Sequence, residues 1–227
     1  MVKKIELIPA ILERNFSRIE FLVKKTTGLV TTTQIDICDG RLTPAKTFAS
    51  GGCLESFKRL NKITNKVNLE LDLIVDFENG PKGRGDKFLN SIKASKAKRV
   101  VFHFSGIKNW DKIFRLVGPV CEIGLGIWLF DDVRQVKKIL EKYPFNYIQI
   151  MGIEKVGYGG QKLSNRVYGK IKYFHKNFPK LPIQVDGGVK VKNSAKLKKA
   201  GVTRLVSGSG FFEADNLEKR VKEFIDS

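Results

Sequence analysis

The chain has 227 residues, a length typical of one large α/β domain or of two small domains. Hydrophobic residues make up 42% of it, which is enough for a substantial core and excludes an intrinsically disordered chain. The formal net charge of +19 makes nucleic acid a candidate partner. However, the excess lysines are spread over all the expected helices, and neither a basic block nor an RNA-binding aromatic signature is present. We therefore expect no nucleic-acid role, but a positive field that attracts an anionic phosphate ester.

The sequence also indicates where the protein works. The first nine residues are too short and too interrupted for a signal peptide, and no apolar run is long enough to cross a bilayer. Cys38, Cys53 and Cys121 lie far apart, which is typical of a reducing compartment and unlike a disulfide framework. We expect a cytoplasmic protein with no membrane segment.

Short runs rich in β-branched residues alternate with runs of helical period along the whole chain. Strands are expected at residues 5–9, 32–37, 68–75, 99–104, 121–127, 147–152, 183–186 and 204–207. Helices are expected at residues 16–26, 54–61, 86–95, 110–116, 132–142, 165–177, 194–200 and 217–225. This alternation predicts a parallel sheet, and eight such units in this length favour a closed (β/α)₈ TIM barrel over an open sheet. No linker divides the chain, so we expect a single barrel domain over residues 1–227.

Some connections between these elements carry additional signals. Residues 38–48 are long for a βα connection and are expected to form a lid or a binding loop. Residues 80–85 are glycine-rich and basic, which favours a solvated flexible loop over a phosphate-binding turn because the Lys-Ser/Thr of a P-loop is missing. Asn165 and Asn193 are expected to be helix N-caps, and Gly201 is expected to end the seventh helix.

Three glycine clusters follow the last three expected strands of the barrel, at residues 157–161, 185–189 and 207–210. Glycine allows a backbone to approach a ligand closely and to present bare N–H groups to it. Consecutive βα units place their turns at the same end of a barrel, so the three clusters predict one phosphate cradle. The middle cluster contains Asp186, which places an acidic group beside the predicted phosphate.

Polar side chains occur near the ends of several expected strands, where barrel enzymes carry their catalytic groups. Gln34 and Asp36 are two residues apart and share one face of a strand, as do Glu70 and Asp72. A helix cap or a salt bridge would account for one buried aspartate, but not for several polar groups at one barrel mouth. For His103, at the end of the fourth strand, a hydrogen-bonded core position is expected.

Five segments, taken in order, resemble the motifs of a known family. Residues 8–12 resemble its P-S-I-L opening, residues 34–40 its H-x-D-x-M-D-G, and residues 157–162 its P-G-F-G-G-Q-K/R. Residues 185–189 and 207–209 match its V-D-G-G-V and A-G-S. The family is that of ribulose-phosphate 3-epimerase, and the resemblance spans nearly the whole chain. It implies a TIM barrel that inverts C3 of a ketose phosphate, converting D-ribulose 5-phosphate to D-xylulose 5-phosphate in the pentose phosphate part of carbohydrate metabolism.

The resemblance also implies roles for individual residues. Asp36 and Asp186 match the two aspartates that act as base and acid on opposite faces of the substrate. A divalent metal, commonly zinc in the family, stabilises the enediolate formed between the two proton transfers. The residues that match the family's backbone phosphate site are Gly159, Gly160, Gly188, Gly208 and Ser209. The resemblance implies no nucleotide cofactor, and it suggests a homo-oligomer.

The chain departs from the family pattern at the metal site. The two metal-binding histidines of the family fall on Gln34 and Asp72, so the matching ligand set of Gln34, Asp36, Asp72 and Asp186 offers oxygen. Oxygen ligands suit magnesium or manganese better than zinc. Without a metal, the acids would share protons or require a basic side chain such as Lys155 or Arg41.

These departures leave other functions open. They include another sugar-phosphate isomerase or epimerase, an aldolase-type barrel, and a non-catalytic homologue that binds a phosphorylated ligand. Two further departures lie near the expected mouth. Trp128-Leu129 stands where the family usually has Asn-Pro, and Ala10 replaces a serine that helps to bind substrate.

Overall fold

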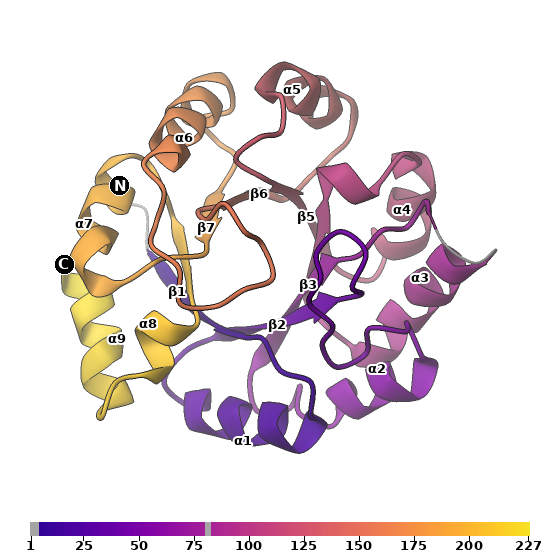
Figure 1. Ribbon diagram of the computed structural model, residues 1–227, viewed down its shortest axis with the longest axis horizontal. Coiled ribbons are helices and arrows are strands. Elements are labelled where there is room, and N and C mark those ends of the chain that lie inside the picture. The colour runs from indigo at the N-terminus through magenta and orange to yellow at the C-terminus, as the bar shows by residue number, and fades with distance from the viewer. Residues whose placement is uncertain (1–4, 80–82) are drawn as a thin grey trace.

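The computed structural model, which describes residues 5–79 and 83–227, contains a closed barrel of parallel strands (Figure 1). The strands are β1 (Glu6–Ile11), β2 (Thr32–Cys38), β3 (Asn68–Ile74), β4 (Arg99–His103), β5 (Glu122–Ile127), β6 (Tyr147–Met151), β7 (Ile183–Asp186) and β8 (Arg204–Ser207). They pair in sequence order, and β8 closes the barrel against β1, with Ile8 opposite Val206. The predicted (β/α)₈ TIM barrel is therefore confirmed.

Helices surround the barrel as an outer ring (Figure 1). They are α1 (Phe16–Thr26), α2 (Leu54–Asn61), α3 (Arg84–Ser95), α4 (Trp110–Val117), α5 (Val133–Lys142), α6 (Arg166–Asn177), α7 (Val191–Lys199), α8 (Ser209–Phe212) and α9 (Leu217–Asp226). Each expected helix is present, and the short α8 was not predicted from the sequence. Of the glycine-rich segment at 80–85, Arg84 and Gly85 begin α3, and residues 80–82 lie outside the described part of the chain.

The start of α7 differs from the sequence prediction. The helix begins at Val191, so the prediction that Asn193 is its N-cap was wrong. The reason is that the backbone at Lys190 is extended and occupies the cap position, while the Asn193 side chain accepts from the Lys190 N–H at 2.9 Å. Asn165 does occupy the N-cap of α6, although its side chain makes no capping hydrogen bond. Gly201, with φ +108°, follows the last turn of α7 as expected.

Each strand turns one row of side chains outward and one row inward. On β3, Leu69, Leu71 and Leu73 are fully buried in the core between the strands and the helices. The alternate residues Glu70 and Asp72 are equally buried, but they hydrogen-bond to residues of other strands inside the barrel. The strand alternation therefore sorts apolar and polar side chains into an outer core and a polar interior.

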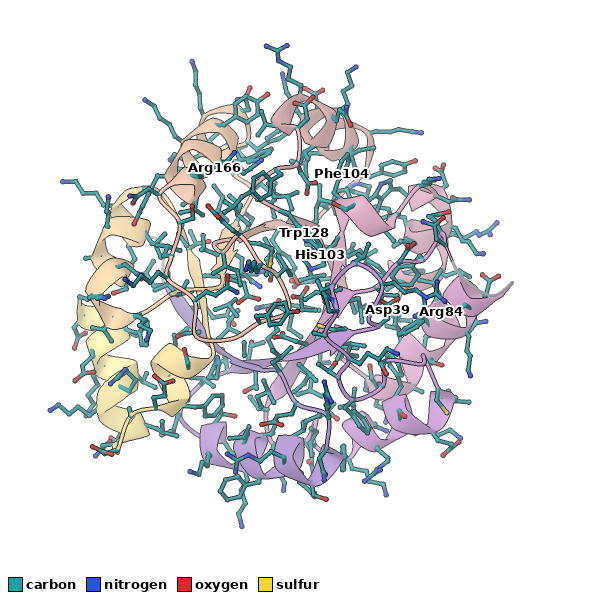
Figure 2. The ribbon with its side chains drawn as sticks, in the orientation of Figure 1. Asp39, Arg84, His103, Phe104, Trp128 and Arg166 are labelled. Carbon is teal, nitrogen blue, oxygen red and sulfur yellow. The ribbon has the colours of Figure 1, made fainter. Side chains whose placement is uncertain are left out.

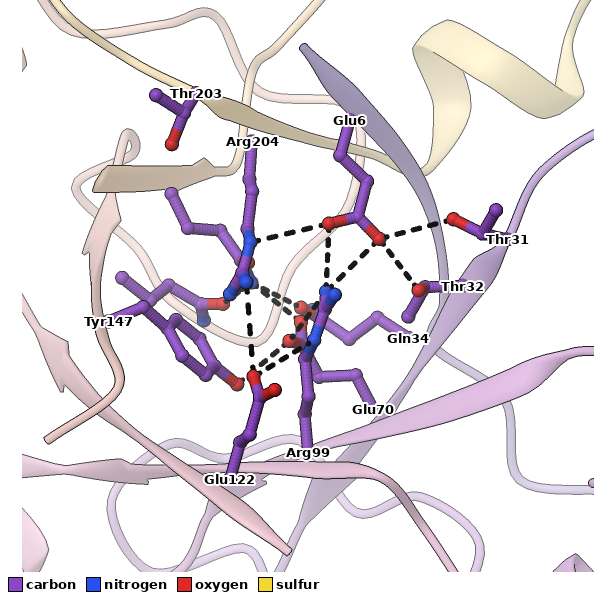
Figure 3. Close-up of polar contacts among 12 residues, drawn as sticks. Glu6, Thr31, Thr32, Gln34, Glu70, Arg99, Glu122, Tyr147, Thr203 and Arg204 are labelled. Carbon is purple, nitrogen blue, oxygen red and sulfur yellow. Dashed lines mark hydrogen bonds and ion pairs between the residues drawn. The ribbon is translucent and has the colours of Figure 1, made fainter. Parts of the chain in front are cut away.

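Charged side chains form the floor of the barrel, at the N-terminal ends of the strands (Figure 3). Arg99 Nη1 lies 3.0 Å from Glu6 Oε2, and Arg204 Nε lies 3.3 Å from the same oxygen. Above them, Glu70 accepts from the Tyr147 hydroxyl at 2.8 Å and from Gln184 Nε2 at 2.6 Å. Burial nevertheless raises the pKa of Glu70 from 4.5 to about 7, because its desolvation outweighs these hydrogen bonds.

This shift predicts a pH-dependent contribution to stability. Since the folded-state pKa of Glu70 is raised, its contribution is complete below about pH 4.5 and is lost as pH rises through 7. Glu70→Gln removes the titration and keeps an acceptor for Gln184. Between pH 5 and pH 8 the wild type should lose about 2 kcal/mol of unfolding free energy that the variant does not lose. The stability of the variant relative to the wild type should therefore rise by this amount.

Urea unfolding at both pH values measures this difference. The half-exposed Glu122, at the same end of the barrel, provides the matched control Glu122→Gln. A stability difference for Glu70→Gln that is the same at both pH values would show that Glu70 is not protonated on folding.

Candidate functional site

A cavity of about 320 Å³ lies at the C-terminal ends of the strands, and both predicted catalytic aspartates line it. Two connections lie across this end of the barrel, the β2–α2 segment in dark purple and the β6–α6 segment in orange (Figure 1). The two segments touch, because a Cβ built on Gly157 would lie 2.6 Å from Thr43 Oγ1. Residues 157–161, which follow β6, line the cavity, and the segment after β2 packs against them.

The β2–α2 segment, expected to be a lid or a binding loop, is attached to the barrel. Asp39 and Lys46 form an antiparallel bridge across it, and the Thr47 hydroxyl donates to the Asp36 carbonyl at 2.7 Å. Asp39 also forms an ion pair of 2.6 Å with Arg84, on the neighbouring α3. These contacts fix the segment beside Asp36.

Three aspartates meet at the bottom of the cavity. Asp36, Asp72 and Asp186 each offer an oxygen atom, and these atoms all lie within 4.8 Å of one another. Gln34 Nε2 donates to Asp36 Oδ1 and to Asp186 Oδ2, both at 2.8 Å. The structure thus brings together the four residues that the sequence predicted as a metal-ligand set.

The environment of these acids favours their protonated forms. Burial, with the nearby charges of Asp186 and Asp72, raises the pKa of Asp36 well above its usual range. Burial and the charge of Asp72 raise the pKa of Asp186 to about 7. Within residues 5–79 and 83–227, no lysine or arginine forms an ion pair with any of the three aspartates, and Arg41 instead donates to the Asn79 carbonyl. Near neutral pH, the raised pKa values favour a proton on this pair of acids unless a cation is present.

The donor set fits a hard divalent cation. Asp72 Oδ2 is buried and has no hydrogen-bond partner among the described residues, which leaves one carboxylate oxygen free at the cluster. Carboxylate oxygens are the ligands that magnesium and manganese prefer. Gln34 turns its amide nitrogen toward the acids, and its Oε1 lies 3.4 Å from Gln184 Nε2. Coordination by Gln34 would require the amide to turn over, and its role as a ligand stays a prediction.

Two residues that the sequence did not assign to the site extend the cluster. His103 Nε2 lies 2.8 Å from Asp72 Oδ1, and Trp128 Nε1 donates to His103 Nδ1 at 2.8 Å. Figure 2 shows both side chains at the mouth, from β4 and from the segment after β5. His103 is buried and hydrogen-bonded as expected, but its partner is an acid of the cluster. Its position at the end of β4 was a signal for this contact, whereas Trp128 stood out in the sequence only as a departure from the family motif near the expected mouth.

The glycine clusters line the other side of the same cavity. All five predicted phosphate-binding residues are among its lining residues: Gly159, Gly160, Gly188, Gly208 and Ser209. Their direct contact with a phosphate stays a prediction. A Cβ on Gly188, which has φ +71°, would lie 2.4 Å from the Leu163 backbone nitrogen, so only glycine fits there. Within the described residues, the Gly188 N–H finds no protein acceptor, so it is free to bind an anion.

Side chains hold the carbonyl groups of this turn away from the cavity. Asn193 Nδ2 donates to the Gly188 carbonyl at 2.9 Å, and the Ser207 hydroxyl donates to the Val189 carbonyl at 2.7 Å. Because both carbonyl oxygens already accept hydrogen bonds from these side chains, the turn can present its N–H groups to a ligand. The residue that was wrongly predicted as an N-cap thus supports the cradle.

Arg18 of α1 also lines the cavity, and the sequence analysis did not identify it. Its Nε lies 3.7 Å from Glu13 Oε1, a distance longer than a strong ion pair, and the side chain is half-exposed. It is a positively charged group that could reach an anion in the cradle.

The fold and the site together define a (β/α)₈ barrel whose mouth holds a glycine-lined cavity beside a cluster of acids. The model of the Ribulose-phosphate 3 epimerase family matches residues 6–212, and the chain belongs to this family. Two named ribulose-phosphate 3-epimerases are similar to it. That of Aquifex aeolicus (strain VF5) is 24% identical over 194 residues, covering 83% of this chain and 80% of the relative. That of Buchnera aphidicola subsp. Acyrthosiphon pisum (strain APS) is 25% identical over 224 residues, covering 95% and 91%.

Solved structures share the fold at lower identity. The 3-hexulose-6-phosphate synthase of Salmonella typhimurium superposes with a TM-score of 0.71 at 14% identity, covering 98% of this chain and 97% of the other. KGPDC of Streptococcus mutans superposes with a TM-score of 0.69 at 13% identity, covering 98% and 96%. These likenesses show the barrel alone. No helix within the described residues is long and apolar enough to cross a membrane.

The acid cluster predicts stabilisation by divalent cations at high pH. Manganese at 100 times its Kd should add about 2.7 kcal/mol to the free energy of unfolding, measured by thermal melting at pH 8. Asp72→Asn should remove most of this gain, because it removes one of the three carboxylates. The exposed Asp215→Asn serves as the control and should retain the gain. An equal gain in both variants would place the cation elsewhere.

Arg18 predicts a contribution to anion binding. Loss of one charge-assisted contact should weaken the binding of a phosphate ester by roughly tenfold in Arg18→Gln. Arg14, which is exposed and lies outside the cavity lining, gives the matched control Arg14→Gln. Calorimetric titration with ribulose 5-phosphate measures both variants, and an equal Kd for the two would exclude Arg18 from the phosphate site.

Proposed function

We propose that the protein is a ketose-phosphate 3-epimerase that interconverts D-ribulose 5-phosphate and D-xylulose 5-phosphate. The observation that carries the proposal is the sharing of one cavity by Asp36, Asp186 and the glycine clusters. Family membership supports the same reaction. The substrate phosphate would bind at the cradle, with its carbonyl end directed toward the acids.

The pair of acids provides the chemistry that inversion at C3 requires. One carboxylate removes the C3 proton from one face, and a carboxylic acid returns a proton to the other face. This needs one ionised and one protonated member, and burial together with the charges of neighbouring acids raises the pKa of both Asp36 and Asp186. The amide nitrogen of Gln34, 2.8 Å from an oxygen of each, fixes the spacing of the two carboxylates.

Negative charge develops on the substrate oxygens when C3 loses its proton. A divalent cation held by Asp36, Asp72 and Asp186 would supply positive charge beside those oxygens. The backbone N–H groups of the cradle orient the substrate through its phosphate. Residues 157–161 after β6, which line the cavity, would reduce the access of water to the reacting carbon.

A second candidate is a different reaction on a sugar phosphate in the same cavity, of the isomerase or aldolase type. It is favoured by Gln34 and Asp72, which stand where the family motif has histidines, and by Ala10, which lines the cavity where the family has serine. A third is a non-catalytic barrel that binds a phosphorylated ligand. The glycine clusters are compatible with all three candidates. The candidates differ in the chemistry that they require of the acid cluster.

Proton exchange at C3 tests the proposed reaction. In D₂O with added magnesium or manganese, the protein should exchange the C3 proton of ribulose 5-phosphate for deuterium, detected by NMR. Asp36→Asn and Asp186→Asn should each slow exchange by roughly 10²–10⁴-fold, because each removes an acid–base group. The exposed Asp215→Asn should exchange like the wild type.

Other outcomes separate the candidates. Absence of exchange with every metal would contradict the epimerase. Turnover of another sugar phosphate in a substrate screen would then support the second candidate. Binding of phosphate esters without any turnover would support the third.

A further inference from the structure

Two hydrogen bonds link Trp128, His103 and Asp72 in a line at the barrel mouth. The Trp128 indole N–H donates to His103 Nδ1 at 2.8 Å, and His103 Nε2 lies 2.8 Å from Asp72 Oδ1. The side chains of His103 and Asp72 are fully buried, and the indole meets the imidazole edge-on, with ring centroids 6.1 Å apart. Figure 2 shows the two rings next to each other at the mouth.

The donor at Trp128 determines where the imidazole carries its proton. An indole N–H can only donate, so His103 Nδ1 must present a lone pair. The proton of the neutral imidazole is then on Nε2, and this N–H donates to Asp72 Oδ1.

Packing fixes the ring in this orientation. Gly126 of β5 lies opposite His103 in the sheet, and a Cβ on Gly126 would lie 2.8 Å from His103 Nδ1. The Trp128 backbone N–H donates to Asp131 Oδ2 at 2.7 Å, which holds the start of the segment after β5. Both partners of the Trp128–His103 hydrogen bond are therefore positioned by their own strand or loop.

The consequence for Asp72 is that its two oxygens differ. His103 occupies Oδ1, while Oδ2 is buried without a hydrogen-bond partner among the described residues. Asp72 also contributes an oxygen to the cluster with Asp36 and Asp186. Histidine N–H groups and carboxylates that hydrogen-bond in this way commonly orient the ligands of a metal.

We propose that Trp128 and His103 are positioning residues that hold Asp72 with one oxygen directed to a divalent cation. Trp128 selects the tautomer, and the selected N–H of His103 turns the Asp72 carboxylate. The cation step rests on the proposed function of the acid cluster, whereas the tautomer step does not depend on it.

The chain allows a direct spectroscopic test, because it contains only two histidines and two tryptophans. In ¹⁵N-histidine-labelled, metal-free protein, NMR should show His103 with its proton on Nε2, and His175 serves as the internal reference. Trp128→Phe keeps an aromatic ring and removes the N–H donor. We expect His103 to lose the pure Nε2–H tautomer in this variant, while the signals of His175 stay unchanged.

Manganese titration tests the second step. Loss of a partner that orients a ligand typically weakens metal binding by about 10–100-fold, and this is the loss expected for Trp128→Phe and for His103→Leu. His103→Gln retains an N–H donor for Asp72 and should recover most of the affinity. Thermal melting of each variant, without metal, checks that it is folded.

An unchanged His103 tautomer in Trp128→Phe would overturn the role of Trp128. A changed tautomer with unchanged manganese affinity, or equal affinities for His103→Leu and His103→Gln, would overturn the positioning of Asp72. Neither measurement uses turnover. If the C3 exchange assay fails, the tautomer and manganese results remain valid. If the tautomer or manganese test fails, the C3 exchange assay still tests the proposed reaction.

Discussion

The burial of carboxylates inside the barrel is the constraint on which the rest of the structure depends. At the floor, Glu6 and Glu122 both form ion pairs with Arg99 and Arg204, so that two negative and two positive charges meet. At the mouth, Asp36 and Asp186 accept from the Gln34 amide and pair with no basic side chain of the described residues, and their pKa values are raised. A buried carboxylate without a counter-charge takes up either a proton or a cation. The lack of a basic partner among the described residues of the mouth therefore favours protonation of these acids or the binding of a cation there.

Hydrogen bonds between inward-facing side chains connect the floor of the barrel to its mouth. Gln184 Nε2 lies 2.6 Å from Glu70 Oε1 and 3.4 Å from Gln34 Oε1. The Gln34 amide turns its oxygen toward Gln184 and its nitrogen toward Asp36 and Asp186, which accept from it. The side-chain amides of Gln184 and Gln34 therefore connect Glu70, near the floor, to the acids of the cavity. A polar barrel interior of this kind is stable only when nearly every group has a partner.

The sequence was sufficient for the barrel because the two rows of each strand differ in chemistry. The alternation of Leu69, Leu71 and Leu73 with Glu70 and Asp72 identified both the strand and its inward face. The same parity brought Gln34, Asp36 and Asp72 to one place, and the motif order placed Asp186 with them. Strand-end position and side-chain parity are local properties, so they can be predicted without coordinates.

The rest of the site depends on contacts that no local pattern encodes. His103 and Trp128 are 25 residues apart, and their hydrogen bond depends on the path of the chain after β5. The sequence does not show which end of the Gln34 amide meets the acids, because that depends on the surrounding acceptors and donors in the folded barrel. Asn193 is a good N-cap residue by composition, but the extended backbone at Lys190 moved the helix start and freed its amide to bind the Gly188 carbonyl.

The two halves of the site are constrained in different ways, which explains why one matches the family motifs and the other does not. The cradle is built from backbone, and at Gly188 any side chain would collide with the backbone nitrogen of Leu163. Substitution there requires the turn to move. The acid side is built from side chains. Different residue types can serve there as long as they place a hydrogen-bond donor or a ligand atom at the same point. Gln34 still directs an N–H at two carboxylates where the family motif has a histidine. Asp72 replaces the other histidine, and His103 on the next strand supplies its donor. The side chains of the acid side can therefore change one at a time, whereas the glycine side keeps the backbone shape that its glycines require.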